Sequence, residues 1–228
     1  MNKNIFVYAN WNSEEESSLL GILSSDIIRG KEVFSFQYDK NWLKESSNFI
    51  LDPQLQYFEG LQYNSGVKSN FGIFLDSSPD RWGRLLMKRK ETLIAKREER
   101  KPLILNESDF LLGVFDENRM GGLRFKLDPQ KDFLNSNREL AAPPFTTLRE
   151  LEYASLKLED EVDDENSLHW LNMLMAPGSS LGGARPKASV KDPSGNLWIA
   201  KFPSKKDDVD IGAWEFIAME ISKQIGIN

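Results

Sequence analysis

The chain has 228 residues, with 29 Lys and Arg against 35 Asp and Glu, one His and no Cys. This length suggests one large domain or two small ones, with enough residues to bury a sizeable core. The absence of Cys excludes a disulfide framework, a thiol nucleophile and Cys-ligated zinc, and a single His excludes a multi-His metal site. The net charge of −6 gives the whole molecule no electrostatic footprint for nucleic acid, so direct nucleic-acid binding is not expected.

No apolar run approaches the ~20 residues that a membrane span needs. The first residues also lack the apolar segment of a signal peptide. We therefore expect a cytoplasmic protein that does not contact a membrane.

The first third of the chain predicts strands. Residues 5–8 and 33–38 are β-branched and aromatic, and residues 19–23 predict a third strand between them. A later segment, residues 123–127, follows a Gly-Gly pair and predicts a further strand.

From Pro79 onward the apolar period becomes helical. Trp82, Leu85 and Leu86 fall at the i, i+3, i+4 spacing, which predicts a helix over residues 80–100. The pair Asn106 and Asp109 has the spacing of a capping box. We expect the next helix to begin there and to bury one face. Its expected buried residues are Phe110, Leu111, Val114 and Phe115.

Composition divides the chain into three parts. Residues 1–127 form the expected N-terminal subdomain, residues 128–147 a linker rich in Asn, Pro and Ser, and residues 148–228 a second unit. The second unit opens with a helical pattern over residues 148–154. The acidic run at residues 159–165 is typical of a solvated loop or helix end, with a metal site as the alternative.

Residues 81–101 hold nine Lys or Arg and three Glu, against the acidic balance of the whole chain. The simpler interpretation is the solvated face of an amphipathic helix. The alternative is docking to nucleic acid or to an acidic partner. No aromatic interleaving or known DNA-binding motif supports that alternative.

The segment richest in chemical signals is residues 177–187, which hold three Gly and two Ser. Glycine permits close approach and positive φ, so its backbone amides can turn toward an anion. Residues 188–191 and 196–202 then predict two strands joined by an Asp-Pro-Ser-Gly turn. The sequence therefore predicts a glycine loop that leads into a β-hairpin.

Two familiar chemistries do not fit this loop. A G-x-S-x-G nucleophile elbow needs a strand before it, a helix after it and a later His, whereas Pro177 precedes the motif, Pro186 follows it and His169 lies upstream. A phosphate loop of the Walker A type would end in Gly-Lys-Ser or Gly-Lys-Thr, whereas Lys187 stands between Pro and Ala.

A third chemistry does fit the order of elements. Protein-kinase-like enzymes place a glycine loop over the phosphates of ATP and a Lys on a following strand. Lys201 lies on the second strand of the expected hairpin, on a face with apolar residues, where a Lys charge is normally paired. Glu215, on a helix that Asp210 would cap, is the candidate partner for an ion pair. The alternative is that Lys201 extends to water and Glu215 is a surface residue.

These segments resemble the HipA family of serine/threonine kinase toxins. The motif Gly-Gly-Ala-Arg-Pro-Lys at residues 182–187 and Trp-Ile-Ala-Lys-Phe-Pro at residues 198–203 are similar to that family's phosphate loop and ATP lysine. Residues 71–84 and 109–125 are similar to its N-terminal subdomain, and residues 214–220 to the helix after the lysine. The matching segments follow one another in order over essentially the whole chain.

The resemblance implies roles for individual residues. It makes Lys201 the ATP lysine and residues 182–187 the nucleotide-contacting loop. That loop consists of Gly182, Gly183, Ala184, Arg185, Pro186 and Lys187. It also aligns Ser180 with a loop serine that family members autophosphorylate. A phosphate of about −2 charge on Ser180 would repel the phosphates of ATP and so would not share a site with them. The alternative is that Ser180 is an ordinary loop serine.

The chain departs from the family in one respect. HipA-type kinases continue into a helical C-terminal lobe that carries the catalytic and metal-binding residues, and no His follows Lys201 here. We therefore expect no catalytic and no metal residue in this chain, with the Mg ligands coming from the missing lobe.

The expected fold is α+β: a β-rich N-terminal subdomain with helices, followed by a kinase-like N-lobe without its C-lobe. The resemblance implies the N-terminal half of an ATP- and Mg-dependent serine/threonine kinase of a toxin–antitoxin system. The missing lobe would be attached in cis or be a separate chain. The implied partners are a DNA-binding antitoxin and, as protein substrate, an aminoacyl-tRNA synthetase. The alternative is a non-catalytic module that binds a kinase lobe or an antitoxin.

Overall fold

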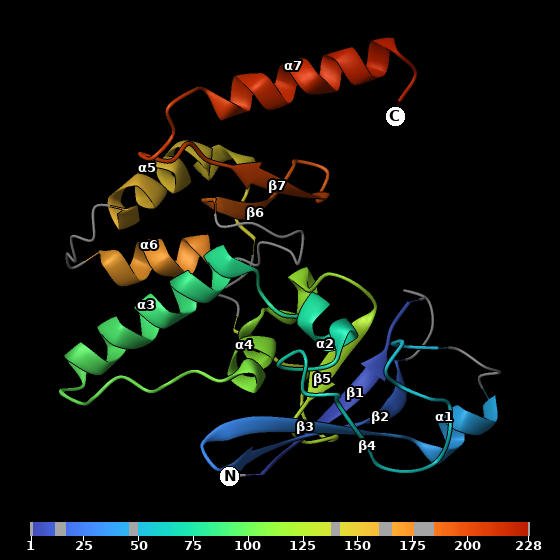
Figure 1. The fold of residues 1–228 in the computed structure, drawn as a ribbon. Coiled ribbons are helices and arrows are strands. Elements are labelled where there is room, and N and C mark those ends of the chain that lie inside the picture. Colours follow the sequence, from blue (N-terminus) through green and yellow to red (C-terminus); the bar gives the residue numbers. More distant parts are fainter. Residues whose placement is uncertain are drawn as a thin grey trace.

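The protein is a mixed α+β molecule, seen here in a computed structural model (Figure 1). The structure describes residues 2–11, 17–45, 50–137, 142–159, 166–175 and 185–227, and every element below lies within these ranges. A five-stranded sheet occupies one end of the molecule, and helices together with a two-stranded sheet occupy the other.

The large sheet is antiparallel throughout and has the strand order β4-β3-β2-β1-β5. Alternate residues of its inner strands are buried, as the period of two in a half-buried strand requires. The strands predicted at residues 5–8, 19–23, 33–38 and 123–127 are confirmed. The observed bounds are β1 (Lys3–Ala9), β2 (Ser18–Ile28), β3 (Lys31–Tyr38), β4 (Gln62–Tyr63) and β5 (Leu123–Lys126).

The first hydrophobic core lies between this sheet and two short helices, α2 (Gly72–Asp76) and α4 (Glu107–Gly113). The predicted capping box of α4 is confirmed: the Asn106 backbone N–H donates to the Asp109 carboxylate at 2.8 Å. A third short helix, α1 (Lys40–Glu45), packs its Trp42 and Leu43 against the same core. Aromatic and aliphatic side chains fill the core, among them Ile5, Leu23, Phe34, Phe36, Phe71, Phe74, Leu111 and Phe125.

A buried arginine joins the loops around this core. Arg119 follows a short 3₁₀ turn (Asp116–Asn118), and its guanidinium donates to four backbone carbonyls at 2.8–3.1 Å. Those carbonyls belong to Ser77, Leu111, Val114 and Leu134. Burial lowers the pKa of Arg119 to about 10, so the side chain stays charged at neutral pH and holds α2, α4 and the 134 region together.

The second core is built from three helices and the hairpin. The helices are α3 (Arg81–Arg97), α5 (Leu148–Glu159) and α6 (Ser167–Leu174), and the hairpin strands are β6 (Lys187–Lys191) and β7 (Leu197–Lys201). A 3₁₀ turn (Phe145–Thr147) leads into α5. The helices predicted at residues 80–100 and from residue 148, and the two strands of the hairpin, are confirmed.

The two cores do not divide at residue 127. Trp82, Leu86 and Leu93 of α3 belong to the second core, although α3 precedes the expected linker. A buried ion pair adds to this packing, because Asp80 at the start of α3 accepts a hydrogen bond from Nζ of Lys187 on β6. Helix α3 therefore connects the N-terminal part of the chain to the hairpin.

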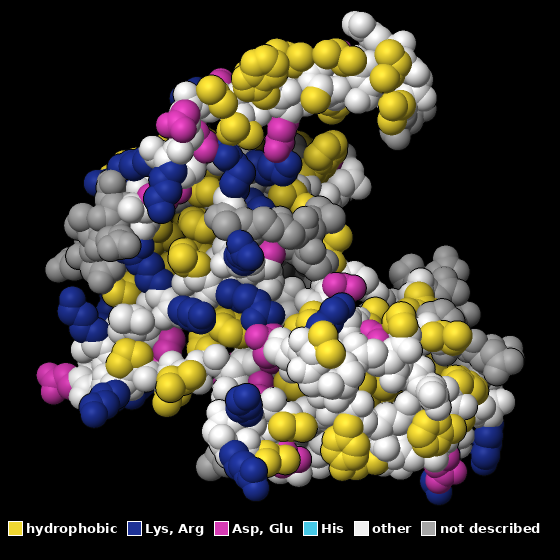
Figure 2. Space-filling view, viewed as in Figure 1, with side chains coloured by type: hydrophobic (Ala, Val, Ile, Leu, Met, Phe, Trp, Pro, Cys, Tyr) yellow, Lys and Arg dark blue, Asp and Glu magenta, His cyan; other side chains and the backbone are white. Residues whose placement is uncertain are grey.

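The last helix, α7 (Ile211–Gln224), projects from the hairpin end of the molecule (Figure 1). Asp210 caps it as predicted, since its carboxylate accepts from the Ala213 N–H at 2.9 Å. None of its residues is buried against the described part of the chain. Its apolar side chains therefore face no core among the described residues, and Figure 2 shows hydrophobic side chains along the helix surface.

Candidate functional site

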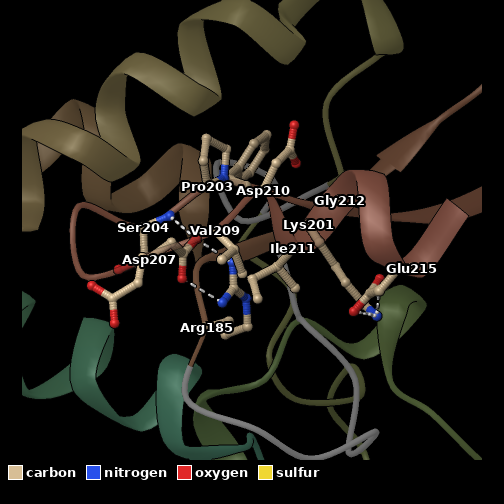
Figure 3. A pocket seen from close by; sticks show the side chains of 12 residues that line it. Arg185, Lys201, Pro203, Ser204, Asp207, Val209, Asp210, Ile211, Gly212 and Glu215 are labelled. Carbon is tan, nitrogen blue, oxygen red and sulfur yellow. Dashed lines mark hydrogen bonds and ion pairs between the residues drawn. The ribbon is translucent and has the colours of Figure 1, made fainter. Parts of the chain in front are cut away.

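A cavity of about 520 Å³ lies where β7 ends and α7 begins (Figure 3). Its walls come from Arg185, two residues before β6, from the end of β7, from the 202–210 segment and from the first turns of α7. The lining residues are Arg185, Lys201, Phe202, Pro203, Ser204, Asp207, Asp208, Val209, Asp210, Ile211, Gly212 and Glu215.

An ion pair between β7 and α7 lies at one side of this cavity. Nζ of Lys201 donates to Oε1 and Oε2 of Glu215 at 3.0 and 2.8 Å. The two side chains are 54% and 49% exposed, so the pair adds only about 0–1 kcal/mol to the free energy of unfolding. Its geometric effect is larger, because it is a direct contact from α7 back to the hairpin (Figure 3).

A second ion pair lies at the other wall. Nη1 and Nη2 of Arg185 donate to Oδ1 and Oδ2 of Asp207 at 2.6 and 2.5 Å, in the bidentate geometry that a planar guanidinium favours. The Asp207 carboxylate also accepts from the Ser204 N–H at 2.9 Å. The hydrogen bond from Arg185 holds the pKa of Asp207 below its usual range, and the same contact raises the pKa of Arg185.

The turn that carries Asp207 is itself fastened to α5. Oε1 of Glu159 accepts from the Ser204 hydroxyl and Oε2 accepts from the Lys205 N–H, both at 2.7 Å. Because α5 packs in the second core, these contacts connect the wall of the cavity to the interior of the molecule.

Lys187 lies away from this cavity. Its side chain is buried and pairs with Asp80, and its carbonyl accepts from Nε1 of Trp82 at 2.9 Å. Lys187 on β6 stands directly opposite Lys201 on β7. The two lysines nevertheless pair with different carboxylates, Lys187 with Asp80 and Lys201 with Glu215.

Of the expected nucleotide-contacting residues, Arg185 and Lys201 line the cavity, whereas Pro186 and Lys187 do not. The Pro186 carbonyl instead accepts from the Phe202 N–H at 2.9 Å. The remaining members of the expected loop, and the acidic run beyond residue 159, lie outside the described residues. The loop members concerned are Ser180, Gly182, Gly183 and Ala184.

More carboxylates than cations line the cavity. Two cations, Arg185 and Lys201, face four carboxylates, which gives the lining a net charge of −2. The carboxylates are those of Asp207, Asp208, Asp210 and Glu215. No group of three or more metal-ligating side chains occurs among the described residues. The cavity can therefore offer cationic donors to an anion, but the described residues supply no cage for a metal ion.

Two partners in these ion pairs were missed by the sequence reasoning. Asp207 lies 22 residues from Arg185, and no local pattern connects them. Asp80 follows Pro79 and precedes a helical pattern, which indicates a helix cap but does not indicate that the same carboxylate reaches Lys187.

Comparison with protein-family models, with curated proteins and with solved structures finds no match to this chain. In the described part of the chain, no helix is long and apolar enough to cross a membrane.

Proposed function

We propose that this chain is the nucleotide-facing half of a HipA-like serine/threonine protein kinase, completed by a helical lobe in cis or as a separate chain. The observation that carries the proposal is the Lys201–Glu215 pair, which joins the second hairpin strand to the following helix. Protein kinases use a strand Lys and a helix Glu in this arrangement to hold the phosphates of ATP. The sequence resemblance to the HipA family supports the same assignment.

ATP and Mg²⁺ are the proposed cofactors. Lys201 and Arg185 fit the phosphates, because both present cationic donors to the cavity. The acidic lining favours a nucleotide whose charge is reduced by Mg²⁺ over free ATP. The metal's protein ligands and the base for the acceptor hydroxyl would come from the second lobe. A protein serine, as in an aminoacyl-tRNA synthetase, and a DNA-binding antitoxin are the substrate and partner that the resemblance suggests.

Titration of Mg·ATP into the chain together with its catalytic lobe tests this proposal. Lys201→Ala should weaken binding at least about tenfold, because it removes a charged phosphate donor. Lys206→Ala is the matched control, since Lys206 is exposed on the neighbouring segment and does not line the cavity. Unchanged binding by Lys201→Ala would contradict the kinase assignment.

A second candidate function is a non-catalytic module that binds a kinase lobe or an antitoxin. It is favoured by the exposed apolar side chains of α7 and β7, among them Trp198, Trp214, Phe216 and Ile221. The two functions differ in their dependence on Lys201. A module would bind its partner equally well with Lys201→Ala, and would show no affinity for Mg·ATP alone or in that complex.

A further inference from the structure

The orientation of Arg185 at the cavity wall depends on one carboxylate. Arg185 immediately precedes Pro186, and its side chain is 35% exposed, so the backbone alone leaves its rotamer undetermined. Asp207, whose side chain is only 16% exposed, binds both Nη atoms. A guanidinium has five N–H donors, and this bidentate contact uses two of them.

Asp207 is in turn held by a continuous set of contacts. It accepts from the Ser204 N–H, the Ser204 hydroxyl donates to Glu159, and Glu159 ends helix α5 in the second core. A side chain fixed in this way can lock a neighbouring cation into one geometry before a ligand arrives. An unsupported Arg would instead lose rotamer entropy each time a ligand bound.

We infer that Asp207 is a positioning residue, which holds the Arg185 guanidinium so that its remaining donors meet a phosphate group in the cavity. This inference rests on the proposed function, because it takes a polyphosphate as the ligand. Asp207 does not touch the ligand itself; it acts through Arg185.

Electrostatics alone makes the opposite prediction for Asp207. The lining has a net charge of −2, so removing any carboxylate charge should favour an anion. Asp208 lines the same cavity and is the next residue in the chain, but no side-chain hydrogen bond or ion pair connects it to Arg185 among the described residues. Asp207→Asn and Asp208→Asn change the local charge equally, so any difference between them reports the contact with Arg185.

The experiment measures binding of Mg·ATP and of inorganic triphosphate to the 228-residue chain by NMR titration, which detects millimolar affinities. Asp207→Asn should weaken both ligands about fivefold to tenfold, because Arg185 loses its bidentate partner. Asp208→Asn should leave affinity unchanged or raise it by up to about threefold. Asp207→Glu keeps the carboxylate and should recover part of the loss. Thermal unfolding of each variant checks that the fold is retained.

A double-mutant cycle tests whether Asp207 acts through Arg185. Arg185→Ala should weaken binding by a similar factor, and adding Asp207→Asn to it should cause no further loss. Tighter binding by Asp207→Asn, or additive losses in the double variant, would overturn the inference.

The outcomes also separate this inference from the proposed function. Loss of affinity with Lys201→Ala but not with Asp207→Asn keeps the kinase assignment and overturns the role of Asp207. Weaker binding of triphosphate by Asp207→Asn supports the positioning role. If the unsubstituted chain binds ATP no more tightly than triphosphate, that result contradicts the nucleotide site. No binding of either ligand by the unsubstituted chain overturns the inference for this chain.

Discussion

At the scale of single residues, Tyr38 shows how burial changes the pKa of a side chain. It ends β3, is 2% exposed and contacts the ring of Phe36 edge-on at a centroid distance of 5.0 Å. Removal from water disfavours the phenolate, and this burial raises the pKa of Tyr38 to about 12. The backbone of Leu51 lowers this pKa, and the nearby Tyr57 and Asp52 raise it, so that burial remains the dominant cause.

This shift predicts a loss of stability in alkaline solution. Between about pH 10, the pKa of an unfolded Tyr, and pH 12, the unfolded chain releases this proton while the folded chain keeps it. The unfolded state then binds fewer protons, so the free energy of unfolding falls as the pH rises. Tyr38→Phe should remove roughly 1–2 kcal/mol of that fall.

Denaturant unfolding at pH 8 and pH 11 measures the effect. Tyr63→Phe is the control, because Tyr63 is 64% exposed on the edge strand β4. Equal pH dependence in the two variants would contradict the assigned burial effect.

At the scale of elements, a buried ion pair is one of the contacts that join α3 to β6. Asp80 has two roles, since Oδ1 accepts from the Gly83 N–H at 2.9 Å and Oδ2 accepts from Lys187. Asp80→Asn separates these roles, because Asn caps a helix as well as Asp does but carries no charge. We expect it to lower the free energy of unfolding by about 3–5 kcal/mol, since the charge of Lys187 stays buried.

Two further variants make this prediction specific. Asp210→Asn, the same change at the exposed cap of α7, should cost under about 0.5 kcal/mol in denaturant unfolding. Lys187→Met added to Asp80→Asn should recover much of the loss by removing the buried charge. A small effect of Asp80→Asn by itself would contradict the stabilising role assigned to the buried ion pair.

Element positions followed from local sequence, but element partners did not. Residue type and helical spacing identified four strands of the sheet, helices α3 and α5, and the hairpin, and a capping Asp identified α7. Each of these signals is contained within one element. The same spacing shows that Trp82 and Leu86 face a core without showing which core, so the placement of α3 with the hairpin was not foreseen. Strand β4 was missed because two residues carry no period.

The ion pairs of the candidate site show the same difference between local signals, which the sequence displays, and contacts between distant segments, which it does not. Lys201 and Glu215 were identified because the hairpin register and the helix cap fix where each side chain starts. The resemblance to the HipA family implied that Lys187 belongs to the nucleotide-contacting loop. The partner that directs its side chain, Asp80, is 107 residues away in sequence. Long-range pairing of this kind depends on the packed fold, which a single sequence does not display.

At the scale of the whole molecule, α7 differs from every other long helix. Helices α3 and α5 each bury residues in the second core, whereas α7 buries none against the described part of the chain. Trp214 is 62% exposed and Ile221 53% exposed, so apolar area that normally stabilises a helix remains in water. Its first turns contact the hairpin through Glu215, which pairs with Lys201.

We therefore expect α7 to open independently of the rest. An isolated helix of 14 residues is marginal in water, and one exposed ion pair adds about 1 kcal/mol at most. In native-state hydrogen exchange, the amides of α7 should exchange with opening free energies near zero, while those of α3 and α5 approach the global value.

Deleting residues 211–228 should accordingly leave the midpoint of thermal unfolding within about 2 °C, because α7 buries no residue against the described part of the chain. Leu151→Ala in α5, a fully buried position, is the contrasting variant and should cost about 2–5 kcal/mol. Protection of α7 equal to that of α3 would contradict this independence. Protection that appears only when a second lobe is added would instead show that α7 gains its stability from the completed molecule, because its apolar side chains then leave water.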